Sequence, residues 1–331
     1  MALKRLTRFL CTASVIVIFF TVSSLFFYRF SLPMAYGDFY SNATSHFKVP
    51  GLSEGFVPQG LDYVSHLDKF LISGYEGIDE KSVVYIGGKG GFEKVELTCD
   101  GGDFFCHTGG ICAWGEYAYI AGCDGYCYVL ALKDLFHENG RAKVIGKFRA
   151  GNNADFISAF DGKLYIGEYY CPIVFPTAEN HHMTTPCSDR HYAIMASFSL
   201  KDNAPLGVDP IPKEAYSIRD SVQGISLTDD GKIIMSSSNS VTGAFLTTYT
   251  FSSFTPSQDI MKILGYEVPL CYLDSSVKTA SVEILPNSEG IVCVDNRIYM
   301  VFEASSFKFS YGRWLNSGYI YSLNLAQVDA C

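Results

Sequence analysis

Hydrophobic positions follow two different patterns along this chain. The first is a continuous run from Phe9 to Phe27, nineteen residues without a charge or a proline, which follows the basic residues Lys4, Arg5 and Arg8. A helix of this length rises about 28 Å, close to the hydrocarbon thickness of a bilayer. Beyond this run, apolar and polar residues alternate in short stretches of strand length, which predicts a mainly β domain.

The N-terminal run predicts a membrane segment over residues 9–27. It is longer than the ~7–15 residues of a signal-peptide core, and residues 31–36 offer only weak cleavage options. We expect an uncleaved signal-anchor, with a cleaved signal peptide as the alternative. The basic end would stay cytoplasmic, so the rest would lie outside the cell or in a lumen, membrane-tethered or secreted. The expected parts are 1–30 (basic end and anchor), 31–44 (linker) and 45–331 (β domain).

The alternating stretches form an internal repeat. Five segments share a polar residue, a small residue or Phe, a short strand, a turn and a second apolar strand. Taking Gln59, Gly109, Asp155, Gln223 and Glu289 as equivalent positions, the intervals are 50, 46, 68 and 66 residues. Turn chemistry such as Asp-Gly separates the paired strands in several units, as in a β-hairpin.

Further strands follow each hairpin, so the repeat predicts four antiparallel strands per unit, which is typical of a propeller blade. The expected third strands are 82–87, 125–132, 192–200, 244–252 and 318–325. The fifth unit lacks a fourth strand of its own, and residues 46–49 could supply it and close the ring. The sequence therefore favours a five-bladed β-propeller; a sixth blade hidden in 253–281 is one alternative and a β-sandwich another.

Charge and cysteine content fit an exported domain. Without the first thirty residues, 21 basic residues stand against 34 acidic ones, a formal charge of −13. This balance suits cationic or neutral ligands and excludes nucleic acid as a partner. Ten cysteines follow Cys11, an even number typical of disulfides. We expect local pairs Cys99–Cys106 and Cys171–Cys187, and glycosylation at Asn42 in the sequon Asn-Ala-Thr.

In a propeller, residues before the first strand and after the second strand of each unit meet at one mouth of the central channel. The expected first set is Gln59, His107, Asn153, Asp155, Gln223 and Glu289. The second is Tyr75, Glu76, Asp124, Glu168, Tyr169, Asn239 and Glu303. Carboxylates, amides and an imidazole can bind a glycan, a peptide or a hard cation such as Ca²⁺. They can equally satisfy strand ends without any further function.

The strand starts PQG, H-x-GG, QGI and EGI resemble those of a loosely defined group of secreted propeller proteins, and more distantly of calcium-dependent lactonase and strictosidine-synthase-like propellers. The resemblance covers about residues 50–330. It implies a channel cation acting as Lewis acid, with Asp155 and Glu289 as metal ligands and His107 with Glu289 or Asp155 as base. The full Glu/Asn/Asn/Asp ligand set of that group is not found, because Gln59 and Gln223 stand where stronger ligands are expected.

The insertion 171–191 contains Cys171, His181, His182, Cys187 and His191. Its spacing matches no closed zinc pattern, so we expect a disulfide-bonded loop that overhangs the channel mouth. The chain also lacks a G-x-S-x-G elbow, a Walker A loop and an H-E-x-x-H motif.

The sequence thus favours a binding module that holds a small molecule, glycan or protein at the channel mouth. The alternative is a Ca²⁺-dependent hydrolase, lactonase- or esterase-like, with its site in the same channel.

Overall fold

The computed structural model describes residues 2–331 apart from 138, 240–241, 252–258, 310–314, 316–317 and 330–331. The chain divides into two compact units, Met1–Ser41 and Asn42–Cys331. The second unit contains every strand, and it consists of antiparallel four-stranded meanders joined in sequence.

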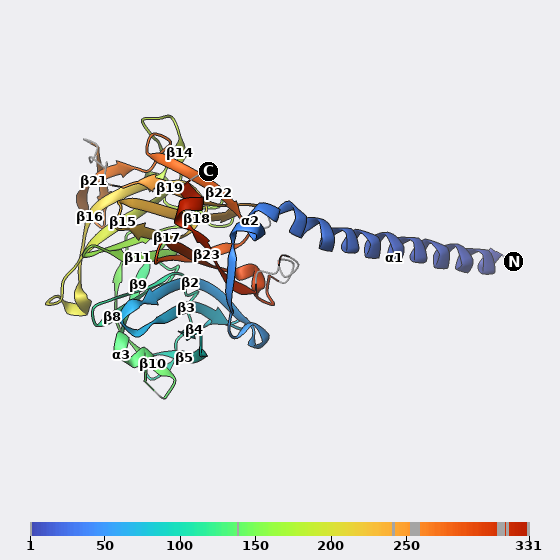
Figure 1. Ribbon diagram of the computed structural model, residues 1–331, viewed down its shortest axis with the longest axis horizontal. Coiled ribbons are helices and arrows are strands. Elements are labelled where there is room, and N and C mark those ends of the chain that lie inside the picture. The colour runs from blue at the N-terminus through green and yellow to red at the C-terminus, as the bar shows by residue number, and fades with distance from the viewer. Residues whose placement is uncertain are drawn as a thin grey trace. The chain divides into compact units, whose positions relative to one another are not determined.

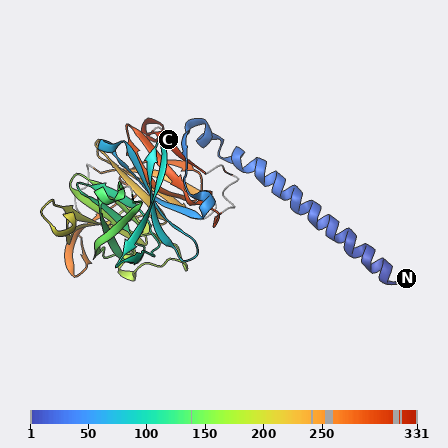
Figure 2. The ribbon, with the colours of Figure 1, turned by 90° about the horizontal axis from the view of Figure 1, so that it is seen from below.

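Five meanders account for most of this unit, and Figures 1 and 2 show them grouped around a common centre. The first is β2 (Phe56–Val64), β3 (Lys69–Glu76), β4 (Lys81–Gly88) and β5 (Gly91–Cys99). The second is β7 (Ile111–Trp114), β8 (Tyr117–Ala121), β9 (Tyr126–Ala131) and β10 (Arg141–Arg149). The third is β11 (Phe156–Phe160), β12 (Lys163–Gly167), β15 (Ala193–Leu200) and β16 (Val208–Ile218). The fourth is β17 (Val222–Thr228), β18 (Lys232–Asn239), β19 (Thr242–Thr250) and β22 (Lys278–Ile284).

The fifth meander joins the two ends of the ring. It contains β23 (Ser288–Val294), β24 (Arg297–Phe302), β25 (Tyr319–Asn324) and, as its outer strand, β1 (Thr44–Lys48). β1 runs antiparallel to β25, with Ser45 opposite Tyr321, and Val49 N–H donates to Gly318 O at 3.0 Å. The prediction that residues 46–49 close the last sheet is therefore confirmed. Closure of this kind leaves no open sheet edge where the ring would otherwise end.

The first strands of the meanders contact one another in a closed circuit, β2 with β7, β7 with β11, β11 with β17, β17 with β23, and β23 with β2. Figure 1 shows β2, β11, β17 and β23 together near the centre. A closed circuit of first strands, each followed by an outward meander, is the architecture of a β-propeller.

Glycine at the start of the first strands permits this close approach. A Cβ at Gly60 would lie 2.6 Å from Ile111 N and 2.8 Å from the Cα of Gly110. A Cβ at Gly290 would lie 2.7 Å from the Cα of Gly60. Real Cβ atoms do not approach other heavy atoms this closely, so the recurring glycine is the residue that lets neighbouring backbones touch.

The remaining elements of this unit are short and lie outside the five meanders. They are β6 (Gly102–Asp103), β13 (Met183–Thr184), β14 (Arg190–His191), β20 (Ile260–Ile263), β21 (Tyr266–Tyr272), α3 (Leu132–Leu135), α4 (Leu325–Asp329) and the single 3₁₀ turns η1 (Leu52–Glu54), η2 (Ser65–Leu67), η3 (Glu179–His181), η4 (Pro205–Gly207) and η5 (Glu303–Ser305). Of the expected insertion 253–281, residues 253–258 lie outside the described part of the chain. Its β20–β21 hairpin pairs in parallel with β16, and its end belongs to β22.

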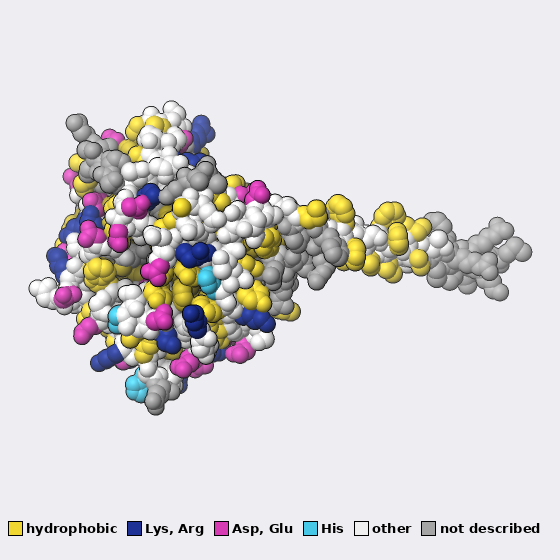
Figure 3. Space-filling model, in the orientation of Figure 1, with side chains coloured by type: hydrophobic (Ala, Val, Ile, Leu, Met, Phe, Trp, Pro, Cys, Tyr) yellow, Lys and Arg dark blue, Asp and Glu magenta, His cyan; other side chains and the backbone are white. Residues whose placement is uncertain are grey.

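The first unit is helical, with α1 (Ala2–Ala35) and α2 (Gly37–Asn42). The side chains of residues 15–20 in α1 are exposed, and Figure 3 shows hydrophobic side chains along its described part. Within the residues that the structure describes, no helix is both long and apolar enough to span a membrane.

The cysteine prediction requires a correction. All nine cysteines from Cys99 to Cys293 are free thiols in the structure, so neither Cys99–Cys106 nor Cys171–Cys187 is a disulfide in it. The Cys106 thiol instead donates to Gly122 O at 2.9 Å. Cys187 is exposed, and the insertion that carries it is held by other contacts, described below. Cys331 lies outside the described residues, and so does the side chain of Cys11.

The close approach of first strands predicts that Gly290→Ala will be costly. The added methyl group must displace the backbone of β2, which should lower the free energy of unfolding by about 1–3 kcal/mol. The measurement is chemical denaturation of residues 42–331. Gly90→Ala is the matched control, because nothing lies within 4 Å of a Cβ at that turn position. Equal stabilities of the two variants would contradict the proposed role of the glycine.

Candidate functional site

Two glutamates lie at the end of the channel where the first strands begin. Glu303 follows β24 directly, and its two oxygens accept hydrogen bonds from amides. Asn287 Nδ2 donates to Glu303 Oε1 at 2.8 Å, and Gln59 Nε2 donates to Glu303 Oε2 at 3.3 Å. Glu289, in β23, is 2% exposed and accepts from Gln223 Nε2 at 3.0 Å. Each glutamate thus accepts a hydrogen bond from one of the two glutamines of the repeat, Glu303 from Gln59 and Glu289 from Gln223.

Among the described residues, both carboxyl groups accept hydrogen bonds from neutral amides, and the charge of Lys308 acts on Glu303 alone, whose pKa it helps to lower. Burial raises the pKa of Glu289 well above its usual value, and the charges of Glu303 and Asp155 raise it further. Burial likewise raises the pKa of Glu303, against hydrogen bonds from Asn287 and Gln59 that lower it. Buried carboxylates that face neutral amides and one another are expensive to keep ionised.

Asp155 adds a third, partly buried carboxyl group at this end. Tyr169 N–H donates to its Oδ2 at 2.7 Å. Burial raises the pKa of Asp155 to about 7, although the hydrogen bonds from Tyr169 and Cys123 act to lower it. The three acids therefore come from the third and fifth meanders of the ring.

Asn287 is a site residue that sequence reasoning missed. It is 5% exposed, and its Oδ1 has no hydrogen-bond partner within the described chain. Buried polar atoms of native proteins almost always have a partner, so an orphaned acceptor calls for an explanation. Its only sequence signal is its place two residues before Glu289, just ahead of a first strand.

His107 lies at the rim and not against the buried acids. Its Nδ1 is 3.1 Å from Glu80 Oε1, and its ring centroid is 4.5 Å from that of Tyr75. Lys308 Nζ donates to Tyr75 Oη at 2.9 Å and also approaches Glu80. Burial acts to raise the pKa of Glu80, but the hydrogen bond and charge of His107 outweigh it and lower that pKa. His107 is therefore paired with Glu80. Neither Glu80 nor Lys308 was among the site residues that the sequence predicted.

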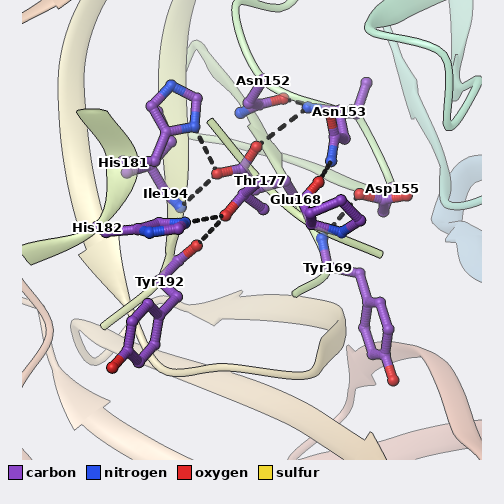
Figure 4. A network of polar contacts seen from close by, with 12 residues as sticks. Asn152, Asn153, Asp155, Glu168, Tyr169, Thr177, His181, His182, Tyr192 and Ile194 are labelled. Carbon is purple, nitrogen blue, oxygen red and sulfur yellow. Dashed lines mark hydrogen bonds and ion pairs between the residues drawn. The ribbon is translucent and has the colours of Figure 1, made fainter. Parts of the chain in front are cut away.

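Glu168 holds the insertion 171–191 (Figure 4). Its Oε1 accepts from His181 Nδ1 at 2.7 Å and from Ile194 N–H at 3.1 Å, while its Oε2 accepts from Asn153 N–H at 3.2 Å. Glu168 is fully buried and His181 is 6% exposed. A buried hydrogen bond between Glu168 and His181, and not the expected disulfide, therefore fixes the base of this insertion.

Aromatic and hydrogen-bonding contacts complete the anchoring of the insertion. Thr177 Oγ1 pairs with His182 Nε2 at 2.9 Å and donates to Tyr192 O, as Figure 4 shows. The His182 ring lies against both Tyr170 and Tyr192. His182 therefore helps to hold the insertion in place. His191 has a similar structural contact, a hydrogen bond with Ser217 Oγ at 2.8 Å.

Other expected site residues have local partners. Glu76 binds Lys94 at 2.5 Å, and Asp124 accepts from Tyr128 Oη at 2.7 Å. The Asn239 Oδ1 atom lies 4.0 Å from Cys171 Sγ.

The acids of the mouth do not form a metal centre in the described residues. No three His, Cys, Asp or Glu side chains there lie close enough together to share a metal ion. Calcium prefers six to eight oxygen ligands, whereas Glu289 and Glu303 are each bound to a different glutamine. The donor set therefore does not fit the cation that the lactonase resemblance implies.

Comparison with known proteins gives fold-level likenesses only. No family model matches the chain, and no curated protein sequence matches it. Among solved structures, glutaminyl cyclase of Myxococcus xanthus is 11% identical with a TM-score of 0.43, over 85% of this chain and 94% of that one. The PQQ-bound aldose sugar dehydrogenase of Streptomyces coelicolor is 14% identical with a TM-score of 0.39, over 78% of each chain. The Swd1 propeller domain of Myceliophteria thermophila is 9% identical with a TM-score of 0.37, over 77% of this chain and 66% of that one, just under two thirds.

The raised pKa of Asp155 predicts a pH-dependent stability. Its folded pKa of about 7 exceeds the ordinary 3.8, so its contribution is full below about pH 4 and is lost as the pH rises through about 7. We expect the melting temperature to fall by several degrees between about pH 5 and 8, and less in Asp155→Asn.

Asp209→Asn is the control for this experiment. Hydrogen bonds from Lys201 and Lys213 lower the pKa of Asp209 to about 2, so this variant should leave the slope near neutrality unchanged. An Asp155→Asn profile parallel to that of the unmodified protein would contradict the assignment.

Proposed function

We propose that this protein is a five-bladed propeller that acts as a binding module, with its ligand at the channel mouth formed by Glu289, Glu303 and Asn287. The five meanders and their closed circuit of first strands support five blades. The proposal rests on one observation, the excess of acceptors over donors among the described residues at this mouth.

The acceptor excess indicates what the ligand must supply. One buried and one partly buried carboxyl group receive hydrogen bonds from amides, and the Asn287 carbonyl oxygen receives none in the described chain. A protonated amine, or a sugar or peptide rich in O–H and N–H donors, would satisfy these acceptors and lower the cost of their burial. A ligand of this kind also suits the acidic balance of the domain.

Hydrolysis in the same channel has weaker support. A lactonase-like reaction needs a base and a Lewis acid, but His107 is paired with Glu80, and the acids among the described residues do not gather around one point. The binding function needs neither.

We further propose that residues 9–27 tether the propeller to a membrane, or direct its secretion if they are removed. The uncharged run and its basic flank support this, together with the exposed apolar side chains of residues 15–20. The exposed Asn42 at the start of the propeller unit is the proposed glycosylation site.

The test is Glu289→Gln in the full chain. The substitution keeps an acceptor for Gln223 and removes the charge, so the fold should survive with an equal or higher melting temperature. Affinity for a ligand found by thermal-shift screening of amino sugars, oligosaccharides and basic peptides should fall tenfold or more, about 1.4 kcal/mol.

Glu168→Gln is the matched control, because it also neutralises a buried glutamate. A glutamine keeps one acceptor oxygen, but its NH₂ group cannot accept from Asn153 N–H or from His181 and Ile194, so one side of this network is lost and the melting temperature should fall. Equal ligand affinity in Glu289→Gln and the unmodified protein would remove Glu289 from the site. A melting temperature that rises with Ca²⁺ and falls with chelator would instead favour the hydrolase.

A further inference from the structure

A cavity lies at the opposite end of the channel from the proposed site. Its volume is about 960 Å³, and all five first strands line it near their C-terminal ends, with residues 62–63, 113–114, 158–160, 226–228 and 292–293. Drug-sized ligands occupy pockets of about 300–1,000 Å³, so the space is large enough for a small organic molecule. The candidate residues of the first mouth do not line it.

The lining of this cavity is strongly acidic. Among its described residues are the aspartates Asp62, Asp229, Asp230 and Asp295, against a single basic residue, Lys232. Lys232 Nζ lies 2.7 Å from Asp230 Oδ2, so these two charges offset each other. Four aspartates and one lysine leave a formal charge of −3 around the cavity, which favours a cation.

Three aromatic residues also line this cavity. Tyr63, Trp114 and Phe160 line the cavity, from the first, second and third meanders. The faces of aromatic rings attract ammonium groups, most strongly for Trp, and aromatic residues near carboxylates recognise quaternary ammonium ligands. A hydrated metal ion would gain little from such walls, whereas an alkylated ammonium fits both kinds of group.

The charge of Asp62 exceeds what the fold requires. Its Oδ2 accepts a hydrogen bond from Ala113 N–H at 2.7 Å, which joins the first strand of one meander to that of the next. Ser226, at the equivalent position of its repeat, accepts from Cys293 N–H at 2.9 Å in the same way. A neutral hydroxyl therefore suffices for the structural bond, and the carboxylate is an additional feature.

Within the described chain, backbone N–H groups and not a basic side chain hold the carboxyl group of Asp62. Burial raises its pKa to about 7, and the groups that act to lower it are the backbone N–H groups of Ala113 and Tyr63. A bound cation would supply the missing positive charge. Acidic and basic side chains are otherwise mixed over the face seen in Figure 3, without large patches of one sign.

We infer that this cavity is a binding site for a small organic cation, an alkylated or quaternary ammonium compound. Asp62 would provide the counter-charge and Tyr63, Trp114 and Phe160 the apolar walls. This site is separate from the mouth formed by Glu289 and Glu303, and it does not depend on that mouth having a function.

The experiment uses choline and its uncharged counterpart of the same shape, 3,3-dimethylbutan-1-ol. The chain has two tryptophans, so Trp314→Phe leaves Trp114 as the sole tryptophan reporter. Choline should change the Trp114 fluorescence saturably at millimolar concentration, and the neutral alcohol should bind at least tenfold more weakly. Asp62→Asn and Asp62→Ser, which keep an acceptor for Ala113, should each weaken choline binding at least tenfold.

Asp100→Asn serves as the matched control, because Asp100 is exposed in the turn after β5 and does not line the cavity. Its choline affinity should equal that of the parent. Equal binding of choline and the alcohol, or no saturable choline signal, would overturn the inference. It would also fall if Glu289→Gln abolished choline binding while both Asp62 variants retained it, since the cation would then occupy the other mouth.

Discussion

Backbone contact between first strands is the constraint on which the rest of the structure depends. Gly60 lies against Gly110, and Gly290 lies against Gly60, at distances that leave no room for a Cβ. Such contact keeps the first strands in a narrow circuit, which is closed by the contact of β23 with β2. The pairing of β1 with β25 adds to that closure from residues far apart in the sequence. A residue at the start or end of any first strand is thereby placed near those of other meanders.

The narrow circuit also separates two chemical environments. At the end where the first strands begin, amide side chains hold Glu289 and Glu303, and Asn287 Oδ1 accepts no hydrogen bond from the described residues. At the opposite end, Asp62 lies among aromatic residues in an open cavity. Both ends contain a carboxyl group whose pKa burial raises, Glu289 at one and Asp62 at the other, and such a group costs stability at neutral pH. Part of the excess of acidic residues in this domain therefore lies at the two ends of the channel.

The repeat made much of the fold predictable, because a glycine followed by alternating apolar residues has few structural solutions. The strand order, the hairpins and the closing segment 46–49 follow from it. The hydrogen-bond partners of side chains were harder to predict from the sequence, because some of them lie in insertions. Glu168 was expected at the mouth, but its partner His181 lies in the insertion, and no repeat position indicates that contact. The even cysteine count suggested disulfides, yet the described thiols are free.

Deviation from the repeat is more informative about function than the repeat itself. Gln59 and Gln223 are the same residue at equivalent positions, and each donates to an acid of the fifth meander, so one amide pattern serves two different carboxyl groups. Asp62 and Ser226 also make equivalent bonds, but one of them carries a charge. Where two residues perform the same structural task, the more costly one needs a second reason. That reasoning points to Glu289 at one end of the channel and to Asp62 at the other.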